Sequence, residues 1–271
     1  MTLTQFLEEY QTVVRVSLTR IRGSSPREAG AEMFVSPDGV YGTIGGGQLE
    51  YLALDQARAM IVQGRQHMAM DVPLGPEIGQ CCGGRVDLSL DRLDAAARQT
   101  AVQRAQDAAA AWPEVLIFGA GHVGRALSVA LAPLPLRVRL IDSRAEELAR
   151  ARAAEGCLTA FPEREIARAG TAAAFVVATH DHALDFLLAG EALQRRDASY
   201  VGMIGSATKR ARFERWLRQT EAAAGADRLV CPMGQVGLGD KRPEVIAAFV
   251  ATDLLQAFAA QNAWQGAEMA Q

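Results

Sequence analysis

The sequence lacks several features that would point to particular classes of protein. Its four cysteines include no C-x-x-C pair, which argues against a zinc knuckle or a disulfide framework and fits a reducing compartment. It has no run of Lys or Arg and a net charge of −3, so we expect no binding to nucleic acid. Even its long apolar runs, such as Ala172–Ala178, are far too short to span a bilayer, and the polar start MTLTQFLEEYQ is unlike a signal peptide. We therefore expect a cytoplasmic protein, with no membrane contact, whose partners are small molecules or other proteins.

The length and the position of one glycine-rich motif predict two domains. A chain of 271 residues is long enough for one large or two modest domains, and the motif stands near its middle. We predict an α/β protein with a C-terminal Rossmann-like parallel-sheet domain and a smaller N-terminal α+β domain. The expected boundaries are an N-terminal domain over 1–93, a helical linker over 94–112, the Rossmann-like domain over 113–261 and a tail over 262–271.

The motif is VLIFGAGHVGRAL, in which an apolar run leads into glycines and then into apolar residues at helical spacing. This pattern predicts a strand, a tight turn and a helix. Gly119, Gly121 and Gly124 have separate expected roles: one allows the turn, one lets backbone approach a diphosphate, and one lets the helix pack closely on the strand. Asp142 ends the next apolar run, where a carboxylate can accept hydrogen bonds from a ribose. The alternative is a Rossmann sheet that keeps the glycines for packing and binds something other than a dinucleotide.

Strand and helix patterns alternate after this motif, which is typical of a parallel sheet with right-handed crossovers. The second helix of the domain is expected over Glu146–Glu155. Ligands of such sheets bind at the carboxyl ends of the strands, and each predicted strand here is followed by glycine or polar residues. These residues are Gly119, Asp142, Thr179–His182, Gly205–Ser206 and Gly234. We expect them to border one cleft.

Two segments at this edge of the sheet have two interpretations each. His180 and His182 stand at a spacing that suits a metal pair, but nothing nearby completes the site, so we favour polar loop residues that border the cleft. Gly205 and Ser206 open a helix in the segment GSATKR, which either offers a second phosphate contact or presents a solvated basic face.

Two glycine-rich loops in the N-terminal third suit anions. The loop RGSSPREAG combines backbone N–H groups with the hydroxyls of Ser24 and Ser25 and the guanidinium groups of Arg22 and Arg27. The alternative is an ordinary polar connection between two strands. The segment GGGQLE opens a helix, where Glu50 either contacts a ligand or stabilises the helix dipole.

The two adjacent cysteines of the segment GQCCGG are the most chemically suggestive residues in the chain. Glycine-rich backbone can approach a thiolate closely, and N–H groups that point at the sulfur lower the pKa of the thiol. Thiolates suit soft metal–sulfur centres and persulfide exchange. Because neighbouring residues in extended backbone face opposite ways, we expect only one of Cys81 and Cys82 to face a cleft. A buried, inert cysteine pair is the alternative.

Taken together, these motifs resemble a known family. The series GSSPREAGA, GTIGGGQLE, GQCCGG, VLIFGAGHVGRAL, ATHDHALD, YVGMIGSATKR and VCPMGQVGLGDKRPEVIAA is similar to the XdhC/CoxI family of xanthine dehydrogenase accessory proteins, from about Ser17 to Leu255. The resemblance implies a non-enzymatic chaperone that binds the molybdenum cofactor (molybdopterin), protects it from oxidation, supports its sulfuration by a cysteine desulfurase and inserts it into the molybdenum subunit of xanthine dehydrogenase. Many relatives carry GLDIGA where this chain has VGLGDKR, which leaves any role of Asp240 open.

The resemblance, combined with the chemistry of the motifs, assigns residues to the cofactor. We expect the three glycines of the Rossmann turn to face its phosphate or a separate nucleotide, and Gln80, one cysteine and Glu50 to lie toward the metal. Cys82 is the first choice for a molybdenum contact, because it leads into the Gly-Gly turn. The full expected set is Ser24, Ser25, Arg27, Glu50, Gln80, Cys81, Cys82, Gly119, Gly121, His122, Gly124, Asp142, Gly205 and Ser206. A homodimer is expected as well, since such a chaperone would match the symmetry of a dimeric client.

Two other functions remain open at this point. The Rossmann turn and Asp142 would also serve an NAD(P)-dependent oxidoreductase, with His180 or His182 as the proton-transfer residue. The N-terminal loops and the cysteine pair, however, have no evident task in hydride transfer. A Rossmann domain that has lost its ligand and only forms a dimer interface is the third interpretation.

Overall fold

The computed structural model describes residues 1–75, 83–220, 225–234 and 239–261. The chain divides into two compact units, with the division between Ala108 and Ala109. Gln80, Cys81 and Cys82 lie outside the described residues. The division falls within helix α3 (Ala95–Ala110), which covers most of the stretch expected to be a helical linker.

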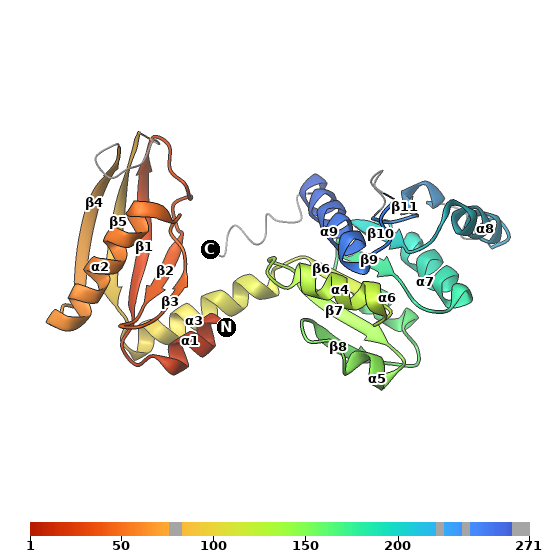
Figure 1. Cartoon of the computed structure of the whole chain (residues 1–271), viewed down its shortest axis with the longest axis horizontal. Coiled ribbons are helices and arrows are strands. Elements are labelled where there is room, and N and C mark those ends of the chain that lie inside the picture. Colours follow the sequence, from red (N-terminus) through yellow and green to blue (C-terminus); the bar gives the residue numbers. More distant parts are fainter. Residues whose placement is uncertain (76–82, 221–224, 235–238, 262–271) are drawn as a thin grey trace. The chain divides into compact units, whose positions relative to one another are not determined.

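Unit 1 is an antiparallel sheet with helix α2 (Gly47–Gln63) on one face (Figure 1). The strand order is β3-β2-β1-β5-β4. The strands are β1 (Val14–Arg22), β2 (Glu32–Val35), β3 (Val40–Gly42), β4 (His67–Leu74) and β5 (Gly84–Arg92). Alternate residues of β1 and β5 are fully buried against α2, because successive side chains of a strand point to opposite faces. A second small core joins α1 (Leu3–Glu9) to α3 and the sheet.

Unit 2 is a parallel sheet in the strand order β11-β10-β9-β6-β7-β8. The strands are β6 (Glu114–Phe118), β7 (Arg137–Asp142), β8 (Glu155–Leu158), β9 (Ala174–Val177), β10 (Tyr200–Met203) and β11 (Leu229–Val230). The first strand of the unit, β6, pairs with both β7 and β9. The chain adds β7 and β8 on one side of β6 and then crosses back to add β9, β10 and β11 on the other side, so the strand order reverses between β6 and β9. This is the topological switch point at which open α/β sheets bind their ligands.

Helices cover both faces of this sheet, as the buried positions of its strands require. The helices are α4 (His122–Leu131), α5 (Ala145–Leu148), α6 (Glu163–Arg168), α7 (His182–Gln194), α8 (Ala207–Leu217), α9 (Pro243–Ala260) and a 3-10 turn (Ala226–Arg228). One core lies between the sheet and α4 and α9, and the other between the sheet and α6, α7 and α8. All residues of β6, β9 and β10 are buried, which is typical of a parallel sheet covered on both sides. The predicted fold class is confirmed.

Two features of unit 2 bear on the expectations from the sequence. Helix α9 is long and apolar enough to cross a membrane by length and composition, but Val250, Leu254 and Phe258 lie in the core of the unit. The helix expected over Glu146–Glu155 is wrong, because α5 ends at Leu148 and β8 begins at Glu155. Strand β8 is an edge strand with mostly exposed side chains, so it shows no apolar run.

Candidate functional site

The glycine turn between β6 and α4 forms the centre of unit 2. Gly119 has φ +108°, and a Cβ there would lie 2.3 Å from the carbonyl oxygen of Ala178, so both its conformation and its neighbour at the end of β9 require glycine. A Cβ at Gly124 would lie 1.9 Å from the carbonyl oxygen of Gly119, so α4 can lie this close to the turn only because residue 124 has no side chain. The predicted turn and packing roles are confirmed for these two residues. Gly121 differs, because its φ is −68° and a Cβ would meet no atom within 4 Å.

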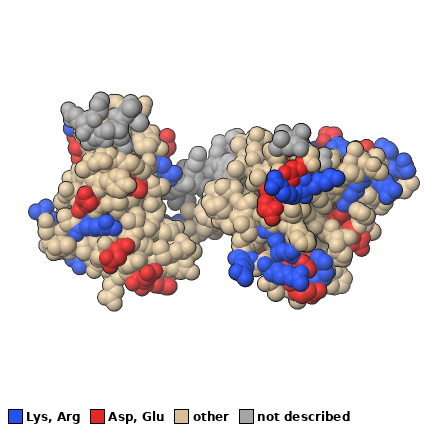
Figure 2. All heavy atoms as spheres, viewed as in Figure 1, with Lys and Arg blue, Asp and Glu red and all other residues tan. Residues whose placement is uncertain are grey.

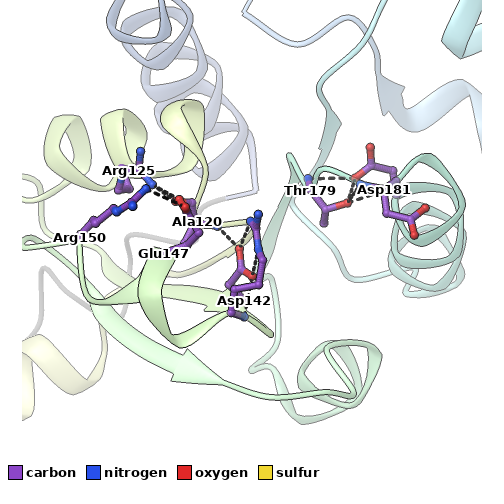
Figure 3. A network of polar contacts seen from close by, with 9 residues as sticks. Ala120, Arg125, Asp142, Glu147, Arg150, Thr179 and Asp181 are labelled. Carbon is purple, nitrogen blue, oxygen red and sulfur yellow. Dashed lines mark hydrogen bonds and ion pairs between the residues drawn. The ribbon is translucent and has the colours of Figure 1, made fainter.

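Asp142 ends β7 beside this turn, and its side chain is only 4% exposed. One carboxylate oxygen accepts hydrogen bonds from Arg144 N (3.0 Å) and Arg144 Nε (2.9 Å), and the other accepts from Ala120 N (2.7 Å) and Arg144 Nη2 (2.8 Å). Figure 3 shows the carboxylate facing the turn at Ala120. Asp142 therefore ties the glycine turn to β7, and a ribose hydroxyl would have to displace one of these donors.

These contacts predict a dependence of stability on pH. Burial raises the pKa of Asp142, but the hydrogen bonds from Arg144 and from Ala120 N outweigh it and lower the pKa to about 2, from an ordinary 3.8. The ionised carboxylate thus contributes on the order of 2 kcal/mol of stability above pH 3.8, and this contribution is lost as the pH falls through about 2. We expect Asp142→Asn to be destabilised at pH 7 and to lose the acid-dependent part of the unfolding free energy, measured by urea unfolding between pH 7 and pH 2.5. Equal stability losses for both proteins over this range would contradict the assignment.

A buried ion pair holds the neighbouring strand ends together. Asp185 of α7 is 1% exposed and forms an ion pair with Lys209 of α8, whose side chain is 10% exposed. The other carboxylate oxygen accepts hydrogen bonds from Thr179 N (3.0 Å) and Thr179 Oγ1 (2.7 Å), at the end of β9. Lys209 Nζ also donates to the carbonyl oxygen of Ile204 (2.8 Å), after β10. Of the two interpretations of this helix, the solvated basic face is therefore wrong for Lys209.

The other polar residues at this edge serve helix ends or border cavities. Ser206 Oγ accepts a hydrogen bond from Lys209 N (3.3 Å) and caps α8. Asp181 caps α7, because its carboxylate accepts hydrogen bonds from the backbone N–H of Ala183 and Leu184. His180 and His182 line two different cavities. The part of the chain that the structure describes contains no group of three His, Cys, Asp or Glu that could hold a metal ion.

Two cavities flank the glycine turn, and Thr179 lines both. The smaller, of about 270 Å³, is mainly apolar and lies between the ends of β7 and β9. It is lined by Gly119, Ile141, Asp142, Pro162, Leu184 and Leu187, among others. The larger, of about 700 Å³, lies toward β10 and combines apolar residues with cations and hydroxyls. Val123, Ile204, Ser206, Thr208, Arg212 and Lys241 belong to its lining.

Three of the predicted loops of unit 1 meet at one end of its sheet. A Cβ at Gly84 would lie 2.1 Å from the carbonyl oxygen of Ser24, and Ser24 forms an isolated bridge with Gly83, the residue that follows Cys82. A Cβ at Gly45 would lie 2.6 Å from Pro26 Cγ. The loop with the sequence GSSPRE therefore contacts both the GTIGGG loop and the Gly-Gly pair after the cysteines. Glycine allows the backbones of Ser24 and Gly84 to approach closely and lets Gly45 lie against the ring of Pro26.

Some polar groups of these loops have hydrogen-bond or ion-pair partners, and others have none among the described residues. Glu50 Oε2 accepts hydrogen bonds from Thr43 Oγ1 (2.6 Å), Ile44 N (3.2 Å) and Gly46 N (3.0 Å), so Glu50 holds the glycine loop in place. Arg22 pairs with Asp71 and Asp87, which removes one of the two cations expected for an anion. Arg27 forms no ion pair among the described residues and lines a cavity of about 560 Å³ in unit 1. The Ser25 hydroxyl is buried and has no hydrogen-bond partner in the described part of the chain.

The described thiols outside these loops are poor candidates for metal contact. Cys231 is 4% exposed, and burial raises the pKa of its thiol. Cys157 lies on the edge strand β8 and is half-buried against the core that α6, α7 and α8 form with the sheet. The predicted roles of Gln80, Cys81 and Cys82 fall outside the described residues and stay predictions.

The strand order and the glycine turn define unit 2 as a Rossmann-type domain, joined in this chain to a small α+β unit. Residues 115–254 match the XdhC Rossmann domain, and residues 6–71 match the XdhC and CoxI family. The chain belongs to the XdhC and CoxI family, which confirms the resemblance drawn from its motifs.

Two relatives illustrate the range of this similarity. The uncharacterized protein YqeB of Escherichia coli K12 is 26% identical over 249 residues, which cover 87% of this chain and 41% of YqeB, so the chain spans less than half of that relative. A crystal structure from Bacillus halodurans, described as a xanthine dehydrogenase, is 18% identical and covers 98% of both chains with a TM-score of 0.77. This similarity shows that the two proteins share their fold.

Proposed function

We propose that the protein binds a molybdopterin-type cofactor and delivers it to xanthine dehydrogenase during maturation of that enzyme. Its membership of the XdhC and CoxI family supports a role in this maturation. The observation that carries the proposal is that one loop of unit 1 contacts two others at the same end of the sheet, through Ser24 with Gly84 and through Pro26 with Gly45. A set of loops that share one end of a sheet can surround one ligand, whereas three separate hairpin connections cannot.

The free groups of these loops fit the parts of such a cofactor. The cofactor carries a phosphate, a pterin ring with many hydrogen-bonding atoms and a dithiolene-bound molybdenum that is sensitive to oxygen. The Ser25 hydroxyl is buried and has no hydrogen-bond partner among the described residues, and Arg27 is a cation without an ion pair among them. A bound ligand could supply both partners. Gly46 has φ +75° and open space at its Cβ position, so its backbone is accessible to a planar ring. Cys81 or Cys82 would then lie toward the metal.

The protein's own residues would hold, orient and shield this cargo rather than transform it. A cysteine desulfurase would supply the sulfur for sulfuration while the cofactor is bound, and the molybdenum subunit of xanthine dehydrogenase would receive it. A homodimer would present two such sites to a dimeric client. The Rossmann turn, through Gly119, Gly121, His122 and Gly124, would contact the phosphate of the cofactor or a separate nucleotide.

An NAD(P)-dependent oxidoreductase is the second candidate, and the two cavities beside the turn favour it. His180 and His182 each line one of these cavities. Asp142, however, has all its carboxylate positions engaged by Arg144 and Ala120. Saturable binding of NADH together with hydride transfer to a small carbonyl compound would favour this candidate over the chaperone.

Retention of free cofactor by loop variants tests the proposal. The protein is mixed with molybdenum cofactor without oxygen and desalted, and molybdenum content and pterin fluorescence are measured. We expect near-stoichiometric retention by the wild type and a loss of at least about tenfold in affinity for Arg27→Ala and for Cys82→Ala. Arg20→Ala and Cys157→Ala are matched controls, since Arg20 is an exposed arginine of β1 and Cys157 lies in unit 2.

The pattern among the variants identifies the contacts. Loss in Cys81→Ala instead of Cys82→Ala would move the thiol contact by one residue, and retention by both would remove cysteine from the binding role. Equal retention by Arg27→Ala and the wild type would contradict the placement of the cofactor at these loops.

A further inference from the structure

Strand β4 forms a long free edge of the sheet of unit 1. Within the described ranges it pairs only with β5, and its residues His67–Leu74 do so in one unbroken register. The opposite edge is β3, which has three residues (Figure 1). Natural sheets often protect an edge with a short strand or a bulge, because a free edge can pair with another chain. Strand β4 is neither short nor bulged, so its edge is open to such pairing.

The hydrogen-bond pattern shows which residues of β4 face this free edge. The backbone N–H of Arg92 on β5 donates to the carbonyl oxygen of Gln66 (2.9 Å), just before β4. In an antiparallel pair, alternate residues bond to the neighbouring strand, so the even-numbered residues of β4 bond to β5. His67, Ala69 and Asp71 therefore direct both an N–H and a C=O away from the sheet.

These three residues are complementary to a second copy of themselves. With a two-fold axis at Ala69, this residue lies opposite its own equivalent and His67 lies opposite Asp71 of the second copy. The three residues then face only one another, and each pair can exchange two N–H···O=C hydrogen bonds. His67 Nε2 has no hydrogen-bond partner among the described residues. Asp71, although paired with Arg22 and Arg85, keeps 46% of its side chain exposed, so the imidazole can donate to it across the axis.

The other face of β4 also suits a second copy. Met68 and Met70 are half-buried at the margin of the core beneath α2. With the axis at Ala69, Met68 lies opposite Met70 of the second copy, so the apolar layer continues from one sheet into the next. The flexible methionine side chain adapts to such a junction. Figure 2 shows charges of both signs scattered over the visible face of unit 1, so no patch of one sign on that face would repel a second copy.

We propose that two copies of the chain associate through β4, which joins their five-stranded sheets into one continuous antiparallel sheet about an axis at Ala69. A single pair of strands is a small interface, so the dimer dissociates on dilution. Because the two strands run in opposite directions, their ends at Leu74 lie on opposite sides of the axis. Leu74 pairs with Gly84, which contacts Ser24. If these loops hold the cofactor as proposed above, the two cofactor sites therefore lie at opposite ends of the joined sheet.

Sedimentation equilibrium of the full chain, without cofactor and over a range of concentrations, measures this association. We expect a monomer–dimer equilibrium for the wild type. Ala69→Pro removes the outward N–H of the central pair, and Ala69→Asp places like charges opposite each other, so each should weaken the dimer about tenfold or more. Proline and charged residues are tolerated at free sheet edges, so both variants should keep the circular dichroism spectrum of the wild type. Ala96→Asp, which adds the same charge at an exposed position of α3, should dimerise as the wild type does.

Oxidative cross-linking tests the register. The Cα atoms of a hydrogen-bonded antiparallel pair lie about 5.5 Å apart, which is within the span of a disulfide. Ala69→Cys is therefore expected to form a disulfide-linked dimer on mild oxidation. Ala96→Cys is the matched control, and the wild type gives the background from the four native thiols.

Three results would overturn the proposal. They are a wild type that is monomeric at every concentration, variants at position 69 that dimerise as tightly as the wild type, and cross-linking of Ala69→Cys no stronger than that of Ala96→Cys. Molybdenum retention by Ala69→Pro is measured in parallel and should equal that of the wild type. A failure of the association is then distinguishable from a failure of cofactor binding.

Discussion

Replacing Gly124 by alanine is expected to prevent unit 2 from forming a stable native state. The added Cβ would lie 1.9 Å from the carbonyl oxygen of Gly119 and 3.1 Å from its carbonyl carbon, so the contact is with backbone and no side chain can move aside. Relief requires α4 to shift away from the turn, which opens the core that Leu127 and Leu131 form with the sheet. Overpacking costs about 1–3 kcal/mol where side chains can adjust, and a backbone clash of this kind should exceed about 3 kcal/mol.

Urea unfolding followed by circular dichroism measures this effect, and the same turn provides the control. Gly121→Ala lies three residues away, adds the same methyl group and meets nothing within 4 Å, so its unfolding free energy should equal that of the wild type. Wild-type stability in Gly124→Ala would contradict the close approach of helix and turn. A large loss in both variants would mean that the turn does not have this geometry.

Lys209→Met is expected to destabilise unit 2 by about 3–5 kcal/mol, the usual result of leaving a buried charge without its partner. Asp185 is 1% exposed, and without Lys209 the hydrogen bonds to its carboxylate that remain among the described residues come from Thr179. Methionine keeps the length and apolar stem of lysine, so the change removes the charge with little change in volume. Thermal and urea unfolding of the full chain report the loss.

The double variant and a surface control separate charge from packing. Asp185→Asn added to Lys209→Met removes the unpaired charge and keeps an oxygen for Thr179 N, so it should recover much of the lost stability. Arg215→Met, exposed on the same helix, should change the unfolding free energy by less than about 0.5 kcal/mol. If Lys209→Met behaves like Arg215→Met, the buried pair does not hold these strand ends together.

The sequence predicted the elements that have a strong local pattern. The buried runs of β6 and β9 and the glycine turn after β6 are visible because strand burial and φ > 0 both restrict residue type locally. The segment Pro37-Asp38-Gly39 has the turn chemistry of a hairpin, and β2 and β3 on either side of it pair antiparallel. The alternation of strands and helices along the chain then predicts a parallel sheet, because few other topologies can connect such elements.

Contacts between distant residues could not be predicted from the same patterns. Nothing in the local sequence pairs Lys209 with Asp185, which is 24 residues away, and the helix pattern alone suggests a solvated basic face. The engagement of Asp142 by Arg144 depends on how the chain turns after β7, so a ribose-binding role was an equally good prediction. The contacts of Ser24 with Gly84 and of Pro26 with Gly45 depend on how β5, β1, β2 and β3 pair, which no single loop encodes.

The most direct test of the central claim is transfer of the cofactor by the wild-type protein. The protein is loaded with molybdenum cofactor without oxygen, desalted, and added to cofactor-free xanthine dehydrogenase, and the activity recovered is compared with that from the same amount of free cofactor. We predict that the loaded protein retains molybdenum near stoichiometrically and restores activity, and that it protects the cofactor during exposure to air. Absence of molybdenum after desalting, with no gain in activity over free cofactor, would contradict the account.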